Sequence, residues 1–330
     1  MTPLRMGARF LASLLATIAG RLRHGPLRPT WTFGFEVMAR TLRRTGLAIG
    51  KLPPLEQRRA WEAIARTQPN RLAKSVRVES VDAGGVPAKW IVPHGVAEDA
   101  PVLVYLHGGS YRYGSFASHG ELVCRIARDA NVRALFVEYR LYPEHRFPAA
   151  VEDAIAATRW VLRSVDASRV VVGGDSAGGA LTVAVLLSLR DAGEPLPPGG
   201  LCICPWVEPT RRGGSMLANA AYDWATPEDF DDWLRTYVDE DQMHDPRFSP
   251  MHADLRGLPP LLIQTGSAEM LYDQIVAFAE KAQAEGVDMR LSVGCDMIHD
   301  WHTLASMFPE PARAVAECAA FVRERTTAGA

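Results

Sequence analysis

The chain has 330 residues, of which 48% are hydrophobic and 22% are charged, and its 36 basic and 38 acidic side chains give a formal net charge of -2. These values are typical of a soluble globular protein with one large domain and room for additional segments. They exclude the strongly basic surface that nucleic-acid binding requires. The five cysteines are odd in number and show no zinc-ligand spacing, which predicts free thiols, a reducing compartment and therefore a cytoplasmic location.

The first distinctive segment is an apolar stretch at residues 10–19, which Arg21 and Arg23 end. It is too short to span a bilayer, because a span needs about 20 apolar residues. Its length also resembles the apolar part of a secretory signal. An amphipathic segment follows at residues 31–47, so we favour a helix packed on the domain. A secretory signal and a membrane-surface helix stay open as alternatives.

A hairpin and then a series of short apolar strands are expected after residue 75. The hairpin covers residues 76–92 and turns at Ala83-Gly84-Gly85. The strands follow at residues 102–106, 132–139, 169–173, 201–205, 261–266 and 289–293. Helical patterns separate several of them, for example at residues 149–163 and 274–285. This alternation predicts an α/β fold with a parallel sheet.

Two stretches lack strand spacing, at residues 1–70 and at about 209–250. We expect both to lie outside the sheet and to form a lid together. The predicted organisation is an N-terminal helical cap segment at residues 1–70 and a catalytic domain at residues 71–330. The second cap segment is the insertion at about 209–250.

The most informative motif is Gly174-Asp175-Ser176-Ala177-Gly178, which directly follows the predicted strand at residues 169–173. It fits the G-x-S-x-G nucleophile elbow, a strand-to-helix turn so tight that side chains at the two glycines would collide with neighbouring backbone. A helical run at residues 180–190 comes next. The order of strand, elbow and helix predicts that Ser176 is the nucleophile of an acyl-transfer enzyme.

A second motif, His107-Gly108-Gly109-Ser110, follows the predicted strand at residues 102–106. Acyl transfer passes through an oxyanion that fixed backbone N–H groups stabilise by several kcal/mol. We expect Gly108, Gly109 and Ala177 to supply these donors as the oxyanion hole. The alternative is a simple glycine-rich turn without a catalytic role.

Together these motifs make the chain similar to the hormone-sensitive-lipase-like branch of the α/β-hydrolase family, a bacterial esterase group with an H-G-G-G loop and a G-D-S-A-G elbow. The sequence Y-R-L-Y-P-E-H at residues 139–145 and D-P-R-F-S-P at residues 245–250 also resemble landmarks of that family. The likeness runs from about residue 75 to the C-terminus. It implies the α/β-hydrolase fold, with a mostly parallel eight-stranded sheet, helices on both faces and a helical cap. The chain departs from the pattern at Ser110, where glycine is usual, and at Tyr142, where alanine is usual.

A serine nucleophile needs a base and an acid, which follow it in this fold in the order acid and then histidine. Only His299 and His302 lie beyond the last predicted strand. The sequence Asp296-Met297-Ile298-His299 resembles the family's histidine loop, so His299 is the favoured base. The H-x-x-H that the two histidines form has no third ligand at a matching spacing, so we expect no metal. No cofactor is implied either.

The acid is expected in the loop after the strand at residues 261–266. Residues 266–273 resemble the family's acid loop, with Glu269 where aspartate is commoner. The extra methylene changes the reach of the carboxylate and not its role. Asp273 is the fallback acid.

The resemblance therefore implies a carboxylesterase that hydrolyses short- to medium-chain acyl esters or lactones through a Ser-His-Glu triad and an acyl-enzyme. Aromatic residues of the two cap segments would line the acyl pocket or form the core of the cap. The expected partner is a small ester, without nucleic acid or a stable membrane span, and a homodimer through the sheet edge suits the fold. Two alternatives remain, namely an acyltransferase that uses the same acyl-enzyme and a non-catalytic small-molecule receptor of the same fold.

Overall fold

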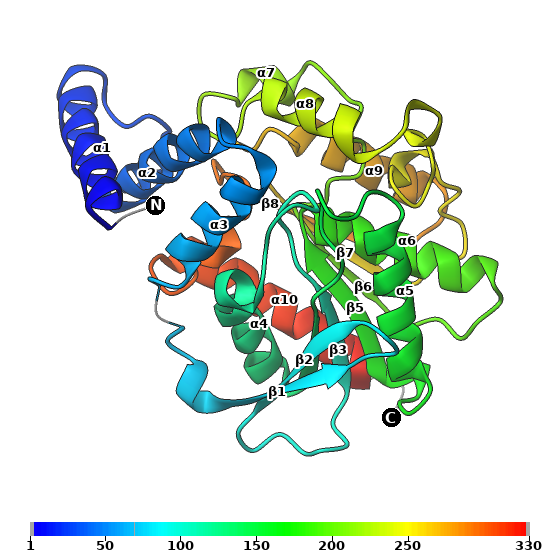
Figure 1. Cartoon of the computed structure of the whole chain (residues 1–330). Coiled ribbons are helices and arrows are strands. Elements are labelled where there is room, and N and C mark those ends of the chain that lie inside the picture. Colours follow the sequence, from blue (N-terminus) through cyan, green and yellow to red (C-terminus); the bar gives the residue numbers. More distant parts are fainter. Residues whose placement is uncertain (1–2, 69, 328–330) are drawn as a thin grey trace.

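A computed structural model describes residues 3–68 and 70–327 (Figure 1). Its centre is one eight-stranded sheet with the strand order β1-β2-β4-β3-β5-β6-β7-β8. The strands are β1 (Val76–Asp82), β2 (Pro87–Pro93), β3 (Val102–Leu106), β4 (Arg133–Val137), β5 (Val170–Asp175), β6 (Gly200–Ile203), β7 (Leu261–Gly266) and β8 (Met289–Gly294). β2 pairs antiparallel with β1 and β4, and all other pairs are parallel. The predicted hairpin and mostly parallel eight-stranded sheet are confirmed.

Helices cover both faces of the sheet, as predicted. α4 (Phe116–Ala130) and α10 (Pro309–Thr327) pack on one face, and α5 (Ala149–Leu162), α6 (Ala177–Asp191) and α9 (Tyr272–Ala284) pack on the other. Successive strand residues point to opposite faces. Val170 and Val172 of β5 accordingly belong to the core under α5 and α6, whereas Val171 belongs to the core under α4 and α10.

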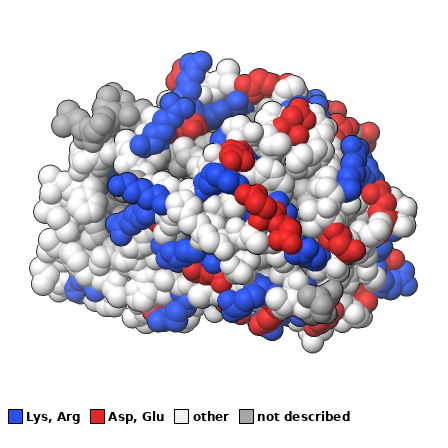
Figure 2. Space-filling view, turned by 90° about the horizontal axis from the view of Figure 1, so that it is seen from below, with Lys and Arg blue, Asp and Glu red and all other residues white. Residues whose placement is uncertain are grey.

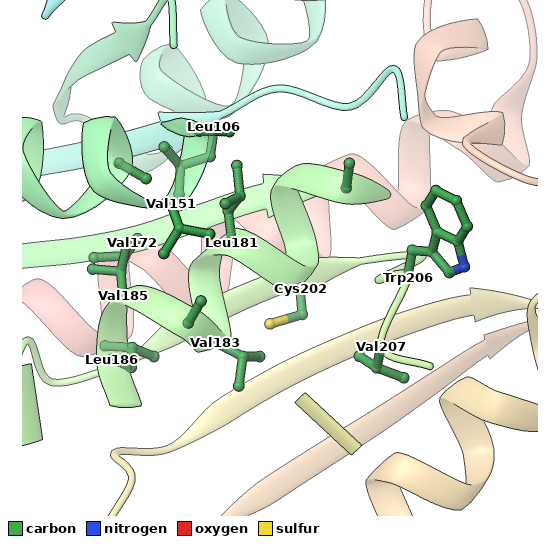
Figure 3. Packing of buried hydrophobic residues seen from close by; sticks show 14 of the residues in the cluster. Leu106, Val151, Val172, Leu181, Val183, Val185, Leu186, Cys202, Trp206 and Val207 are labelled. Atoms are coloured by element: carbon green, nitrogen blue, oxygen red, sulfur yellow. The ribbon is translucent and has the colours of Figure 1, made fainter. Parts of the chain in front are cut away.

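The helix that follows the elbow is the most deeply buried one. α6 crosses the middle of the sheet, and Figure 3 shows its Leu181 and Val185 packed near Val172 and against Val151 of α5. Burial of aliphatic side chains like these stabilises a fold by about 1.5–3 kcal/mol each. The end of β5 and the start of α6 are therefore held rigidly, and they carry the elbow.

Two groups of helices lie outside the sheet, beyond the carboxyl ends of its parallel strands (Figure 1). The first group is α1 (Pro3–His24), α2 (Phe33–Gly50) and α3 (Pro54–Ala65), and the second is α7 (Ser215–Ala218) and α8 (Pro227–Tyr237). They touch each other, because Arg43 of α2 donates a hydrogen bond of 2.7 Å to the carbonyl of Asp223.

The helix expected near the N-terminus is present as α1, and its burial pattern is one that the sequence left open. α1 packs on α2, and its small polar residues Ser13 and Thr17 are buried. Its larger apolar side chains, including Leu15 and Leu22, are exposed. Among the described residues, no helix is both long enough and apolar enough to cross a bilayer.

Candidate active site

The elbow places Ser176 between β5 and α6 in a conformation that few residues adopt, with φ 52° and ψ −117°. Its N–H donates to the carbonyl of Ile203 over 2.8 Å, and its own carbonyl accepts from Trp206 over 3.0 Å. A Cβ at Gly178 would lie 1.8 Å from the carbonyl oxygen of Leu106, and one at Gly174 would lie 2.3 Å from the same atom. The two glycines are needed because the elbow passes directly against the end of β3.

Ser176, His299 and Glu269 form a continuous chain of hydrogen bonds. His299 Nε2 lies 2.9 Å from Ser176 Oγ, and His299 Nδ1 lies 2.5 Å from Glu269 Oε2. All three residues are buried. The imidazole links the hydroxyl to the carboxylate. It can therefore accept a proton from the Ser176 hydroxyl while the Glu269 carboxylate holds the imidazole in the required tautomer.

The other oxygen of Glu269 is fixed from within its own loop. Glu269 Oε1 accepts hydrogen bonds from Thr265 Oγ1 at 2.5 Å and from the N–H of Gly266 at 2.8 Å. These donors are the last two residues of β7, so the end of the strand sets the direction of the carboxylate. The longer side chain of glutamate therefore reaches His299 from a rigid base.

The structure separates the favoured residues from the fallback ones. Asp273 accepts a hydrogen bond of 2.7 Å from the N–H of Ser215 in α7, and it does not contact His299. His302 is buried and pairs with Gln264 Oε1 at 2.7 Å, and burial lowers its pKa to about 3. Of the candidates, only Glu269 and His299 lie in line with Ser176.

One carboxyl group at this site was not foreseen from the sequence. Asp300 follows His299 directly, has φ 51°, and places Oδ2 3.3 Å from His299 Nε2. Burial raises the pKa of Asp300 to about 8, against the opposing effect of His299. Burial lowers the pKa of His299, but Asp300 and Glu269 outweigh it and raise that pKa to about 10. The only sequence signal was an acidic residue next to the expected base.

The loop after β3 differs from the expectation at one donor. The N–H of Gly108 donates to Asp175 Oδ2 over 3.0 Å, so it is already engaged. By contrast, no described residue accepts a hydrogen bond from the N–H groups of Gly109, Ser110 or Ala177. Among the expected donors, Gly109 and Ala177 therefore keep a free N–H group, Ser110 offers a further one, and the N–H of Gly108 is used to hold Asp175.

Asp175 is the centre of that bracing. In addition to Gly108, it accepts a hydrogen bond of 2.7 Å from the hydroxyl of Tyr105, and its Oδ2 lies 3.1 Å from His119 Nε2. Burial raises the pKa of Asp175, but His119 and Tyr105 more than offset this and hold it below its usual range. His107 stacks on Tyr139 at 4.3 Å between ring centres. This buried network ties the loop to the elbow.

One group of three described residues has the right atoms for a metal ion. Cys204, Glu269 and His299 place one potential ligand atom each within 4.8 Å of one another. Glu269 and His299 are already hydrogen-bonded to each other, and burial raises the pKa of the Cys204 thiol well above its usual value. Since a metal needs the thiolate, this set is poorly suited to hold one. All five cysteines are free, and Cys295 is the exposed one.

Two cavities border the loop at residues 109–113. The larger has a volume of about 480 Å³ and is lined by His299, Gly109 and apolar residues of α1, α2 and α3. The smaller has a volume of about 50 Å³ and is lined by Ser110, Trp206 and Phe230 among others. The aromatic residues expected in the cap divide between the two roles, because Trp224 lines both cavities whereas Trp31 is buried against Phe35 and Tyr222.

Comparisons with known proteins identify the family to which this fold belongs. The family described as alpha/beta hydrolase fold matches residues 103–303. An acetyl-hydrolase of Streptomyces hygroscopicus is 40% identical over 251 residues, which cover 76% of this chain and 83% of that protein. A carboxylesterase of Mycobacterium tuberculosis is 32% identical over 261 residues, which cover 74% and 82%. A solved esterase of the bacterial hormone-sensitive lipase family superposes with a TM-score of 0.79 at 40% identity, covering 86% of this chain and 98% of that one.

The fold and these matches define the class of the protein, which is that of esterases built on the α/β-hydrolase fold. The relatives include acetyl-hydrolases and carboxylesterases with similar sequences along most of the chain. The chain belongs to the α/β-hydrolase family, in its bacterial hormone-sensitive-lipase branch, and is a carboxylesterase.

Proposed function

We propose that this esterase works through a Ser176-His299-Glu269 triad and an acyl-enzyme. The supporting observation is the buried chain of hydrogen bonds from Ser176 Oγ through both imidazole nitrogens to Glu269 Oε2. Ser176 Oγ attacks the ester carbonyl carbon while His299 Nε2 takes its proton, and Glu269 stabilises the imidazolium without becoming protonated. The C–O bond to the alcohol then breaks, and His299 gives the proton to the leaving oxygen.

Water completes the cycle on the acyl-enzyme. His299 takes a proton from water while the water oxygen attacks the acyl carbon. The bond between this carbon and Ser176 Oγ then breaks, His299 returns the proton to Ser176 Oγ, and the carboxylic acid is released. The oxyanion of each tetrahedral intermediate would be held by the N–H groups of Gly109, Ser110 and Ala177, because these are the unengaged donors around Ser176. Such donors contribute about 2.7–4 kcal/mol each to the transition state.

The two cavities suggest how the ester is oriented. The group that leaves must lie beside His299, which protonates it, and His299 lines the cavity of about 480 Å³. The acyl chain would then point to the other side of the loop, where the cavity of about 50 Å³ is bounded by Trp206 and Phe230. We therefore assign a short acyl group and a larger apolar alcohol to the preferred ester. A lactone joins both parts in one ring and would have to fit across the loop.

We further propose that residues 1–70 and 209–250 act as a cap on the catalytic domain at residues 71–330. Arg58 of α3 supports this, since it donates a hydrogen bond of 2.7 Å to the carbonyl of Arg112 and pairs with Glu144 at 2.8 Å. The first cap segment is thereby fixed to the loop that carries the oxyanion donors. The free thiols favour a cytoplasmic enzyme, and the homodimer expected for the fold stays a prediction.

The test is a two-way ester series. p-Nitrophenyl esters from acetate to palmitate vary the acyl chain, and acetate esters of increasingly long alcohols vary the leaving group. We expect kcat/KM to fall beyond the shortest acyl chains, to rise with alcohol length, and to disappear in Ser176→Ala. Full activity of Ser176→Ala would overturn the triad, and a preference for long acyl chains would overturn the orientation.

A further inference from the structure

Helix α1 has the reverse of the usual pattern for a helix on a globular protein. Such helices bury an apolar stripe and expose polar residues, but α1 buries Ser13 and Thr17, at 0% exposure each. Its exposed residues Leu11, Leu15, Ile18 and Leu22 follow each other by four, three and four positions, so they form one outward stripe. Leu15 is 58% exposed and Leu22 is 84% exposed. Small residues toward the partner helix and large aliphatic ones outward are typical of helices in contact with lipid.

The charge around this stripe has one sign. Residues 1–35 contain five arginines and no aspartate or glutamate, and the first acidic residue of the sequence is Glu36. Glu36 is buried and paired with Arg21 and Arg40, so its charge is not offered to the outside. Of the five arginines, Arg21 is thus paired with Glu36, and Arg28 is paired with Asp296. Arg23, beside Leu22, is exposed. Figure 2 shows that the left end of the molecule, on the side where Figure 1 places α1, is largely uncharged and bordered by basic groups.

The same helix also borders the larger cavity. Met6 and Phe10 of α1 line the space of about 480 Å³ that His299 also lines. Phe10 is 47% exposed and directly precedes Leu11 of the outward stripe. Phe10 therefore lies both on the exposed surface of α1 and at the wall of the cavity.

We propose that the outer face of α1 docks on a lipid bilayer that carries anionic headgroups. An exposed aliphatic stripe beside arginines, on a helix that does not span the bilayer, is the pattern of an interfacial helix. The stripe would enter the headgroup region while the exposed Arg23 meets lipid phosphates. A further consequence, which rests on the proposed function, is that apolar esters dissolved in the bilayer would reach His299 through the cavity beside Phe10.

A second copy of the chain is the competing occupant of this face. The spacing of Leu11, Leu15, Ile18 and Leu22 also suits pairing of two helices. However, a copy would bring the same arginines and no carboxylate from residues 1–35. Like charges would then face each other, which destabilises such a pair. An anionic lipid surface complements both the apolar stripe and the charge.

The experiment measures vesicle binding with full-length protein that carries Ser176→Ala, so that hydrolysis does not alter the lipids. Flotation with phosphatidylcholine vesicles, with and without phosphatidylglycerol, gives the partition coefficient. We expect clear binding that requires phosphatidylglycerol and weakens with salt. Leu15→Glu/Leu22→Glu should lower the coefficient by about a hundredfold, and Arg23→Gln by about fivefold on the anionic vesicles alone. The control is Leu217→Glu, because Leu217 is 64% exposed on α7.

Three results would overturn the docking. The first is that the protein does not bind anionic vesicles. The second is that Leu217→Glu lowers the partition coefficient as much as Leu15→Glu/Leu22→Glu does. The third is that the protein binds no lipid and is a dimer, which Leu15→Glu/Leu22→Glu converts to a monomer. Folding of the double variant is checked, with Ser176 intact, by thermal unfolding and by turnover of water-soluble p-nitrophenyl acetate. If wild type binds vesicles but hydrolyses no ester, the proposed function fails while the docking stands.

Discussion

Replacing Asp300 by asparagine should shift the pH dependence of catalysis in a defined direction. Asp300 Oδ2 lies 3.3 Å from His299 Nε2, and two unit charges at that distance interact by about 5 kcal/mol at an effective dielectric constant of about 20. Burial raises the pKa of Asp300, which opposes ionisation of the carboxyl and so reduces the effect of this interaction on His299. We therefore expect a shift of about one to three pKa units for His299.

The sign follows from the charge. The Asp300 carboxylate favours the imidazolium form of His299, whose pKa is raised to about 10 although burial acts to lower it. Asp300→Asn removes that anion, so the pKa of His299 falls and the neutral base is present at lower pH. The acidic limb of the kcat/KM profile should accordingly move to lower pH. Asp175, Glu269 and His119 also act on Asp300 and are unchanged in the variant.

The assay is p-nitrophenyl acetate hydrolysis across the pH range, corrected for the ionisation of the product. Asp296→Asn is the matched control, because Asp296 lies on the same loop but pairs with Arg28 and Thr30 instead of His299. It should leave the limb in place. An acidic limb that stays fixed or moves to higher pH in Asp300→Asn would refute the electrostatic argument.

Three further predictions concern the acid, the elbow and the smaller cavity. Glu269→Gln should lower steady-state kcat by about 10⁴-fold, because the amide no longer holds the imidazole of His299 in the required tautomer. The control Asp273→Asn should change kcat by less than about threefold. Equal losses in the two variants would contradict the assignment of Glu269 as the acid. Gly178→Ala should lower the free energy of unfolding by more than about 2 kcal/mol, because the added Cβ would lie 1.8 Å from a carbonyl oxygen of β3. Urea denaturation measures this change, and an unchanged free energy of unfolding would contradict the close contact between the elbow and β3. Phe230→Ala should raise kcat/KM for octanoate relative to acetate by about tenfold by opening the smaller cavity; an unchanged ratio would place the acyl chain elsewhere.

The sequence predicted the sheet well because its strands are short apolar runs between clear turns. β3 and β7 begin and end where the pattern placed them, at Val102–Leu106 and Leu261–Gly266. β5 continues to Asp175, two residues beyond the apolar run. Its last residues pair with β6 through their backbone, and such pairing leaves no mark in the hydrophobic pattern.

The candidate site was predictable only as far as motifs and chain order carry information. The motifs and the chain order indicated that Ser176, Glu269 and His299 lie together. They carried no information on which backbone N–H groups remain without a hydrogen-bond acceptor. Gly108 is engaged because Asp175 turns back from the elbow toward it, a contact between residues 67 positions apart. The sequence also left open which side of α1 the protein buries. An apolar run shows that a helix has an apolar face, and only tertiary packing shows whether the domain covers that face.

The most direct test of the triad is intact-protein mass spectrometry after reaction with a fluorophosphonate. The account predicts a mass increase of one phosphonyl group on Ser176, complete loss of ester turnover in the labelled protein, and no labelling of Ser176→Ala. Labelling at another residue, or ester turnover that continues in Ser176→Ala, would contradict the assignment of Ser176 as the nucleophile.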